Sequence, residues 1–253
     1  MRPFLLVCWF LATQLSASAT CNTSPDLSAS VPAFRVQQAS RIEALLRFGD
    51  ENGLCFGIEE VDAALLTELA DFDIKNSTVQ ATIKSILGPG HPITTEKHYG
   101  VIELRPRSRR ATSRNILDFV ISKWEANRGE LQLVSWLLRI QLATELNPQI
   151  KGFGGDARAG DTRDEVGPFN ERNVPVRYLL DKIVAQSRGG SSWIVQVNWE
   201  ELHDFTLFQN RSAWTIVEYE GHKANYATLL NGIAAGLNQK TNADDKRPPG
   251  AVR

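Results

Sequence analysis

The chain has little excess charge and only one extended apolar run. Its 28 lysines and arginines almost balance its 29 aspartates and glutamates, which gives a formal net charge of -1. Nucleic-acid binding and general membrane binding need a field of one sign, so we expect no nucleic-acid partner. Beyond the apolar run at the N-terminus, no stretch reaches the roughly 18 to 20 residues that span a bilayer. The sequence therefore predicts a mature chain without a transmembrane span.

The sequence also lacks the short motifs of common catalytic sites. It contains no Gly-x-Ser-x-Gly elbow, no Gly-Lys-Ser/Thr phosphate loop and no His-Glu-x-x-His pair. None of its four histidines has the spacing of a helical zinc site. We therefore expect no cofactor, no bound metal and no catalytic residue. A hydrolase site assembled from residues far apart in the sequence stays open, because geometry defines such sites.

The N-terminus has the pattern of a secretory signal peptide. Arg2 precedes an apolar run from Phe4 to Ala12, and Ala17-Ser18-Ala19 supplies a small-x-small cleavage site. We interpret residues 1–19 as a signal peptide that is cleaved near Ala19. This predicts a periplasmic or secreted protein. A lipoprotein acylated at Cys21 is the alternative.

Two cysteines, Cys21 and Cys55, remain once the signal is removed. A disulfide between them can persist in an oxidising compartment. The alternative is a pair of unrelated thiols, with Cys55 simply filling a strand position. The sequence leaves both interpretations open.

The first folded unit is predicted over residues 31–106, after a flexible leader at residues 20–30 that is rich in Ser, Thr, Pro and Asp. Its patterns follow the order strand, helix, strand, strand, helix, strand, strand. Asn76 or Ser77 is expected to cap the second helix, because Ser77 and Gln80 have the spacing of a capping box. The last two strands are predicted to form a hairpin around His98-Tyr99-Gly100.

This unit resembles the short N-terminal domain found in secretins and in outer-membrane receptors that depend on the TonB system. The residues that carry the resemblance are Ala44-Leu45-Leu46-Arg47-Phe48-Gly49 with Gly53-Leu54, then Asn76-Ser77-Thr78-Val79 with Ile83, Ile86 and Leu87, and a final strand from Gly100 to Leu104. The resemblance implies paired βαβ-type halves and a role in binding another envelope protein. The barrel, plug or secretin body of that family has no counterpart in this sequence.

A basic linker is predicted at residues 107–114. The surrounding stretch contains five arginines, which are Arg105, Arg107, Arg109, Arg110 and Arg114. We interpret it as an exposed boundary between two domains. The functional alternative is contact with an anionic envelope polymer, since guanidinium groups suit phosphate and carboxylate.

A second α/β domain is predicted over residues 115–237, followed by a disordered tail at 238–253. The helix-start pattern of Asn76-Ser77-Thr78-Val79 returns 97 residues later as Asn173-Val174-Pro175-Val176, so the second unit repeats part of the first. We expect a strand at Ile116–Val120, a long helix at Glu130–Leu146 and a strand pair near the C-terminal end.

The tryptophans of the second unit have two possible roles. Trp136 and Trp193 fall on apolar stripes, so we expect them in the core. Trp199 and Trp214 lack a clear stripe, and they are our candidates for a platform on which sugar rings stack.

Together these patterns predict an α+β protein of two small βαβ-type units with mixed sheets covered by helices. The favoured function is that of an exported, non-enzymatic interaction protein of the bacterial cell envelope, which binds another envelope protein through sheet edges or apolar grooves. One alternative is an envelope polymer or glycan binder that uses the linker arginines with Trp199 or Trp214. The other is a hydrolase with a dispersed active site. The sequence does not predict an oligomeric state.

Overall fold

The structure is a computed structural model that describes residues 21, 25–59, 63–89, 93–106, 115–146, 164–195, 214–219, 226 and 230–231. Over these ranges the chain is α+β with mixed strand pairing, which confirms the predicted fold class. The predicted signal peptide, basic linker and tail lie outside the described residues. No helix in the described ranges is both long enough and apolar enough to cross a membrane.

The first unit folds in the predicted order, and the connection before its third strand contains a short helix. Its elements are β1 (Ser30–Ser40), α1 (Arg41–Asn52), β2 (Cys55–Ile58), α2 (Ala63–Thr67), β3 (Leu69–Thr78), α3 (Val79–Leu87), β4 (Ile93–His98) and β5 (Val101–Pro106). Helix α1 begins after Ser40, whose side chain accepts a hydrogen bond from the Glu43 amide, and ends at Gly53 in the left-handed region (φ 62°). Strands β4 and β5 form the predicted hairpin.

The predicted cap of α3 is wrong by one or two positions. Thr78 is the capping residue, and its hydroxyl accepts a hydrogen bond from the Ala81 amide at 3.2 Å. Strand β3 runs on to Thr78, so Asn76 and Ser77 still belong to the strand. Asn76 instead adopts a left-handed backbone (φ 48°), which asparagine tolerates better than most residues.

The second unit begins differently from the prediction. Its elements are the 3-10 helix η1 (Ile116–Asp118), then β6 (Val120–Ala126), β7 (Gly129–Glu130), α4 (Leu131–Leu146), β8 (Glu165–Val166), β9 (Phe169–Pro175), α5 (Val176–Ala185), β10 (Ser191–Val195) and β11 (Trp214–Glu218). The expected strand at Ile116–Val120 is wrong, because the Asn115 side chain accepts from the Leu117 amide and closes a turn there. The long helix and the final strand pair are confirmed.

One central sheet joins the two units. Its strand order is β11-β10-β2-β5-β4, with parallel pairs at β10-β2 and β2-β5 and antiparallel pairs at both edges. The central strand β2 thus has a first-unit neighbour on one side and a second-unit neighbour on the other. The two units are therefore built into a common core.

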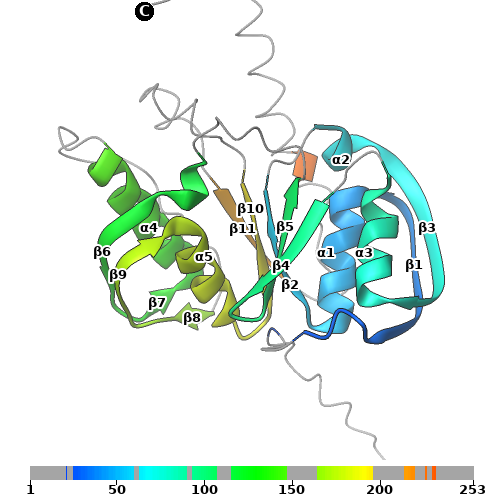
Figure 1. The fold of residues 1–253 in the computed structure, drawn as a ribbon, viewed down its shortest axis with the longest axis horizontal. Helices are drawn as coiled ribbons and strands as arrows, with labels where there is room; N and C mark the ends of the chain where they lie inside the picture. Colours follow the sequence, from blue (N-terminus) through cyan, green and yellow to red (C-terminus); the bar gives the residue numbers. More distant parts are fainter. Residues whose placement is uncertain are drawn as a thin grey trace, which may run out of the picture.

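The layers on either side of this sheet mirror each other. Helices α1 and α3 lie beside one face, with the antiparallel pair β1-β3 outside them; α4 and α5 lie on the other side, with β6-β9 outside them (Figure 1). The predicted repeat is visible here. Asn76 and Asn173 have φ values of 48° and 54°, and α3 and α5 each begin three residues later, at Val79 and Val176.

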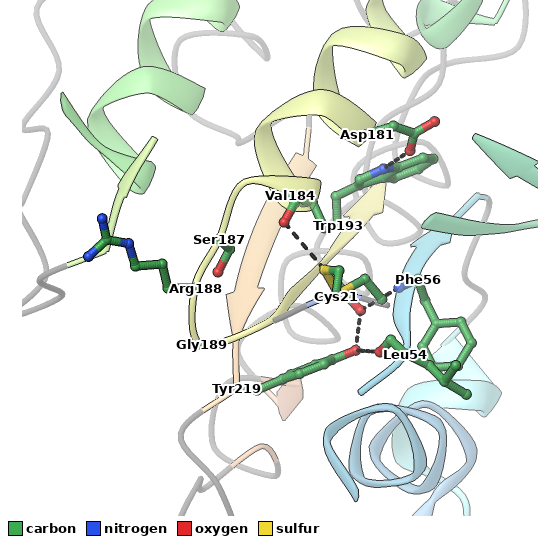
Figure 2. The surroundings of a disulfide bond; sticks show 12 residues. Cys21, Leu54, Phe56, Asp181, Val184, Ser187, Arg188, Gly189, Trp193 and Tyr219 are labelled. Carbon is green, nitrogen blue, oxygen red and sulfur yellow. Dashed lines mark hydrogen bonds between the residues drawn. A yellow bond between two sulfur atoms is a disulfide. The ribbon is translucent and has the colours of Figure 1, made fainter. Parts of the chain in front are cut away.

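Cys21 and Cys55 form a disulfide with a Cα–Cα distance of 5.5 Å, which decides between the two interpretations of these cysteines. The bond ties the segment before β1 to the central strand β2. The Cys21 sulfur also lies 3.4 Å from the carbonyl oxygen of Val184 at the end of α5 (Figure 2). A sulfur in a disulfide is not free for acylation, so this pairing disfavours the lipoprotein alternative.

Candidate functional site

Several predicted binding residues have structural roles instead. Trp214 is buried, and its indole N–H donates to Ser135 Oγ at 2.9 Å, so the prediction of an exposed sugar platform at Trp214 is wrong. Arg105 belongs to an internal ion-pair network, so it does not extend the basic linker. Arg107, Arg109, Arg110, Arg114 and Trp199 lie outside the described residues. Trp193 is buried in the core, as predicted.

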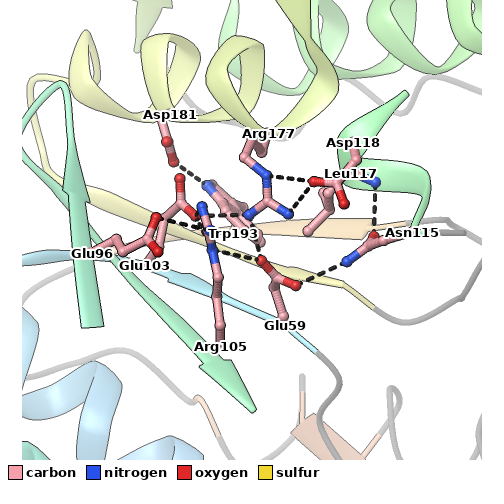
Figure 3. Close-up of polar contacts among 10 residues, drawn as sticks. All are labelled: Glu59, Glu96, Glu103, Arg105, Asn115, Leu117, Asp118, Arg177, Asp181 and Trp193. Carbon is pink, nitrogen blue, oxygen red and sulfur yellow. Dashed lines mark hydrogen bonds and ion pairs between the residues drawn. The ribbon is translucent and has the colours of Figure 1, made fainter. Parts of the chain in front are cut away.

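Charged side chains gather on the face of the central sheet that α5 covers. We call Glu59, Glu103, Arg105, Arg177 and Asp181 the ionic cluster. Glu59 follows β2, Glu103 and Arg105 lie on β5, and Arg177 and Asp181 lie one turn apart on α5 (Figure 3). The cluster therefore joins strands of the first unit to a helix of the second.

The sheet register makes room for this cluster. Trp193, Gly57, Glu103 and Glu96 are direct neighbours across β10, β2, β5 and β4. A Cβ at Gly57 would overlap the Trp193 ring, so only glycine lets the indole lie across β2. In this position the indole N–H donates to Asp181 Oδ1 at 2.8 Å. The tryptophan thus carries a polar contact from the sheet to α5.

The two arginines connect the acids. Arg177 Nη1 donates to Glu59 and to Glu103, the latter at 2.8 Å, while its Nη2 binds Asp118 on η1 at 2.7 Å. Arg105 Nε lies 2.7 Å from Glu103 Oε2 and 3.2 Å from Glu59 Oε1. Burial alone would lower the pKa of Arg177, but the Glu59 charge and hydrogen bonds to Glu59 and Asp118 raise it overall.

Two buried carboxyls of the cluster, Glu103 and Asp181, lie next to each other. Figure 3 shows the carboxyl groups of Glu103 and Asp181 pointing toward each other, and the two side chains are both 0% exposed. Burial first, then the Glu103 charge and the hydrogen bond to it, raise the pKa of Asp181 to about 9. Burial acts upward on Glu103 too, but the hydrogen bond from Asp181 and the charges of Arg105 and Arg177 bring its pKa below the usual value. The pKa values of the two acids are therefore shifted in opposite directions.

The glutamates of the ionic cluster are buried and paired with its arginines. Glu59 and Arg177 are only 4% and 3% exposed, and their polar atoms are used by one another and by Glu103, Asp118 and Asn115. Paired carboxyls can serve as acid and base in hydrolysis, but that chemistry requires contact with the scissile bond. The geometry instead suits a network of ion pairs and hydrogen bonds that holds α5 on the sheet.

A second feature lies on the surface beside the ionic cluster. His98 and Tyr99 lie at the tip of the β4-β5 hairpin, and His98 lies against Tyr178 of α5. We call these three side chains the aromatic patch. The His98 and Tyr178 rings stack with centroids 4.0 Å apart. Lys182 places its ammonium 5.1 Å from the Tyr99 ring centroid and pairs with Glu171 at 2.7 Å. Tyr99 is 49% exposed.

Neither feature was predicted from the sequence. The cluster residues come from elements far apart in the chain. In the sequence, each of them has the pattern of an ordinary surface charge. One signal was present: Glu103 interrupts the apolar strand Val101-Ile102-Glu103-Leu104, and β5 lies inside the sheet with these four residues buried. An acid in such a strand needs a buried partner.

No protein-family model, curated protein or solved structure matches this chain. The resemblance of residues 31–106 to the short domain of secretins and TonB-dependent receptors stays a prediction.

Proposed function

We propose that the chain is an exported, non-enzymatic interaction protein of the bacterial cell envelope, and that it binds another envelope protein through the aromatic patch. The observation that carries this proposal is the backbone of Tyr99. Tyr99 and Gly100 both have positive φ values, 50° and 86°, as the two central residues of a type I′ hairpin turn require. Asn or Gly normally occupies the first of these positions.

Tyr99 contacts Lys182, but the residue stays about half exposed in a turn that suits Asn or Gly better. A left-handed backbone costs a residue with a side chain roughly 1 to 2 kcal/mol, and the exposed part of the ring recovers little of that through burial. Exposed tyrosines are enriched among the residues that dominate protein–protein binding energy. Tyr178 and His98 extend the same surface from another element, which favours a partner that packs an apolar or aromatic side chain on the rings.

Two further observations support export and a binding role. The Cys21–Cys55 disulfide suits an oxidising compartment, as the predicted signal peptide requires. The acids that converge in the ionic cluster are enclosed, which favours a structural role for them over hydrolysis.

The test is a photocrosslinking capture from envelope extract of the organism that encodes the chain. A photoreactive phenylalanine analogue replaces Tyr99 in one protein and Leu69 in a matched control. Leu69 is 60% exposed and lies at the start of β3, on the first-unit side of the molecule. We expect a crosslinked envelope protein from position 99 and none from position 69.

Tyr99→Asn supplies the second arm. Asparagine tolerates the left-handed turn, so this variant should be as stable as the natural chain or more stable by about 1 kcal/mol. It should nonetheless capture the partner at least tenfold less well. Equal capture by Tyr99→Asn and the natural chain would refute the role of the patch, and crosslinking from both positions would refute a specific surface.

A further inference from the structure

The buried charges of the ionic cluster balance only if one acid is neutral. Arg105 and Arg177 supply two positive charges, which Glu59 and Glu103 match with two negative ones. Asp181 is a further acid, and burying an unpaired ionised carboxylate is prohibitively unfavourable. In the part of the chain that the structure describes, no cation other than Arg105 and Arg177 contacts the cluster.

Two carboxyl oxygens that accept no hydrogen bond from either arginine lead to the same conclusion. Glu103 Oε1 and Asp181 Oδ2 are buried and have no N–H or hydroxyl donor among the described residues. The two carboxyls face each other, so one proton placed between them satisfies both oxygens (Figure 3). The other oxygens are occupied, since Asp181 Oδ1 accepts from Trp193 and Glu103 Oε2 accepts from both arginines.

We propose that Glu103 and Asp181 share one proton, and that this proton keeps α5 seated on the central sheet, so that alkaline conditions release the helix. Loss of the proton places two carboxylates against each other at a buried site. The repulsion separates α5, which carries Asp181, from β5, which carries Glu103. The helix also carries Tyr178 and Lys182, so its release pulls the aromatic patch apart.

Among the described residues, the cations of the ionic cluster are already paired with other acids. The charged or titratable groups on the elements around Asp181 are Arg177, Tyr178 and Lys182 on α5, Glu103 and Arg105 on β5, Glu59 after β2, Glu96, Lys97 and His98 on β4, Asp118 on η1, Glu171 and Arg172 on β9, and Arg139 and Glu145 on α4. Both cluster arginines already bind carboxylates. Glu171 pairs with Lys182, and Glu145 binds Ser122. A second negative charge at Asp181 therefore acts mainly on Glu103.

The experiment compares the natural chain with Asp181→Asn by hydrogen exchange and mass spectrometry at matched pH. The amide of asparagine can donate to Glu103 and accept from Trp193, so it reproduces the protonated acid without titrating. The quantity compared is the ratio of exchange rates, natural chain over Asp181→Asn, for each peptide. Between pH 7 and pH 9.5 we expect this ratio to rise at least fivefold more for peptides from α5 than for peptides from α1.

Comparison at one pH cancels the chemical pH dependence of exchange, and both proteins contain the same tyrosines and lysines. Equal α5 exchange at pH 9.5 would overturn the proposal, and so would an equal acceleration in α1, because that outcome means global unfolding. Partner capture plays no part in the readout. The proposal can therefore fail or stand independently of the proposed binding function.

A second variant covers the case in which Asp181→Asn does not fold. Glu103→Gln removes the charge that repels ionised Asp181, so the α5 transition should disappear or move below pH 8. Infrared spectra of the natural chain at pH 7 should also contain the carbonyl band of a buried protonated carboxylic acid, and Glu103→Gln should shift or abolish it. An unchanged α5 transition together with no such band would refute the shared proton.

Discussion

The Cys21–Cys55 disulfide should supply a large share of the stability of the chain. The two cysteines are 34 residues apart. The relation between loop length and denatured-chain entropy gives about 4 kcal/mol for a loop of this size at 25 °C. A domain of ordinary stability unfolds with about 5 to 15 kcal/mol, so loss of the bond should remove a quarter or more of the total. For a chain of this size this corresponds to a fall in Tm of roughly 8 to 16 °C.

The measurement is urea unfolding of the oxidised chain, the same chain in reductant, and a double variant Cys21→Ala with Cys55→Ala. Alanine is the better replacement because Cys55 is buried among apolar residues, where serine would add its own polar cost. The reduced chain and the double variant should both lose about 4 kcal/mol, and reductant should not change the double variant further. A loss below about 1 kcal/mol in both would refute the reasoning, since the bond would then constrain an already compact denatured segment.

Three further predictions follow from single contacts. Gly57→Ala should lower the free energy of unfolding in urea by about 3 kcal/mol, because the new Cβ displaces the Trp193 ring from its hydrogen bond to Asp181. Gly129→Ala is the matched control, since its Cβ would meet its nearest neighbour at 3.7 Å, and it should lower the free energy of unfolding far less. Thr78→Ala should lower the free energy of unfolding by about 1 kcal/mol, because α3 loses its cap. An equal decrease from Ser77→Ala would contradict the assignment of Thr78 as the capping residue. Asp181→Asn should raise the free energy of unfolding at pH 7 by about 3 kcal/mol, because the natural acid must stay protonated in the folded state well above its ordinary pKa.

The raised pKa of Asp181 also predicts how the free energy of unfolding depends on pH. The pKa of Asp181 is 3.8 in its ordinary state and about 9 in the folded chain, so the folded state binds a proton that the unfolded state releases. Stability should therefore fall as pH rises from about 4 to 9, by up to about 1.4 kcal/mol per pH unit for one proton. Urea unfolding at several pH values should give this slope for the natural chain and a flat profile for Asp181→Asn. A natural chain with a flat profile would contradict a raised pKa.

Local patterns in the sequence were sufficient for most of the elements. Apolar spacing located α1, α3, α4 and α5, and the repeat at Asn76 and Asn173 marks the same strand-to-helix transition in both units. The errors are local too. The helix cap was misplaced because Asn76, Ser77 and Thr78 are all good capping residues, and only the length of β3 decides among them.

The candidate site was beyond such reasoning because it depends on pairing between distant strands. Glu103 and Trp193 become neighbours only through β2, which places Gly57 between them. Nothing in the sequence around Trp193 indicates that its indole will cross a glycine 136 positions earlier. Trp214 was misjudged for the same reason, since its partner Ser135 lies on a helix 79 residues away.

The position of β2 has a consequence for a chain that leaves a ribosome or a translocon N-terminus first. Strand β5 emerges soon after β2 and can pair with it on one side, while β4 pairs with the far edge of β5. Its other side stays open until β10, at residues 191–195, has emerged as well. Unpaired strand edges can pair with other chains. The partly synthesised protein therefore exposes one unpaired edge of β2 until β10 has emerged. The Cys21–Cys55 bond needs only the first 55 residues and can therefore fix the early part before the sheet is complete.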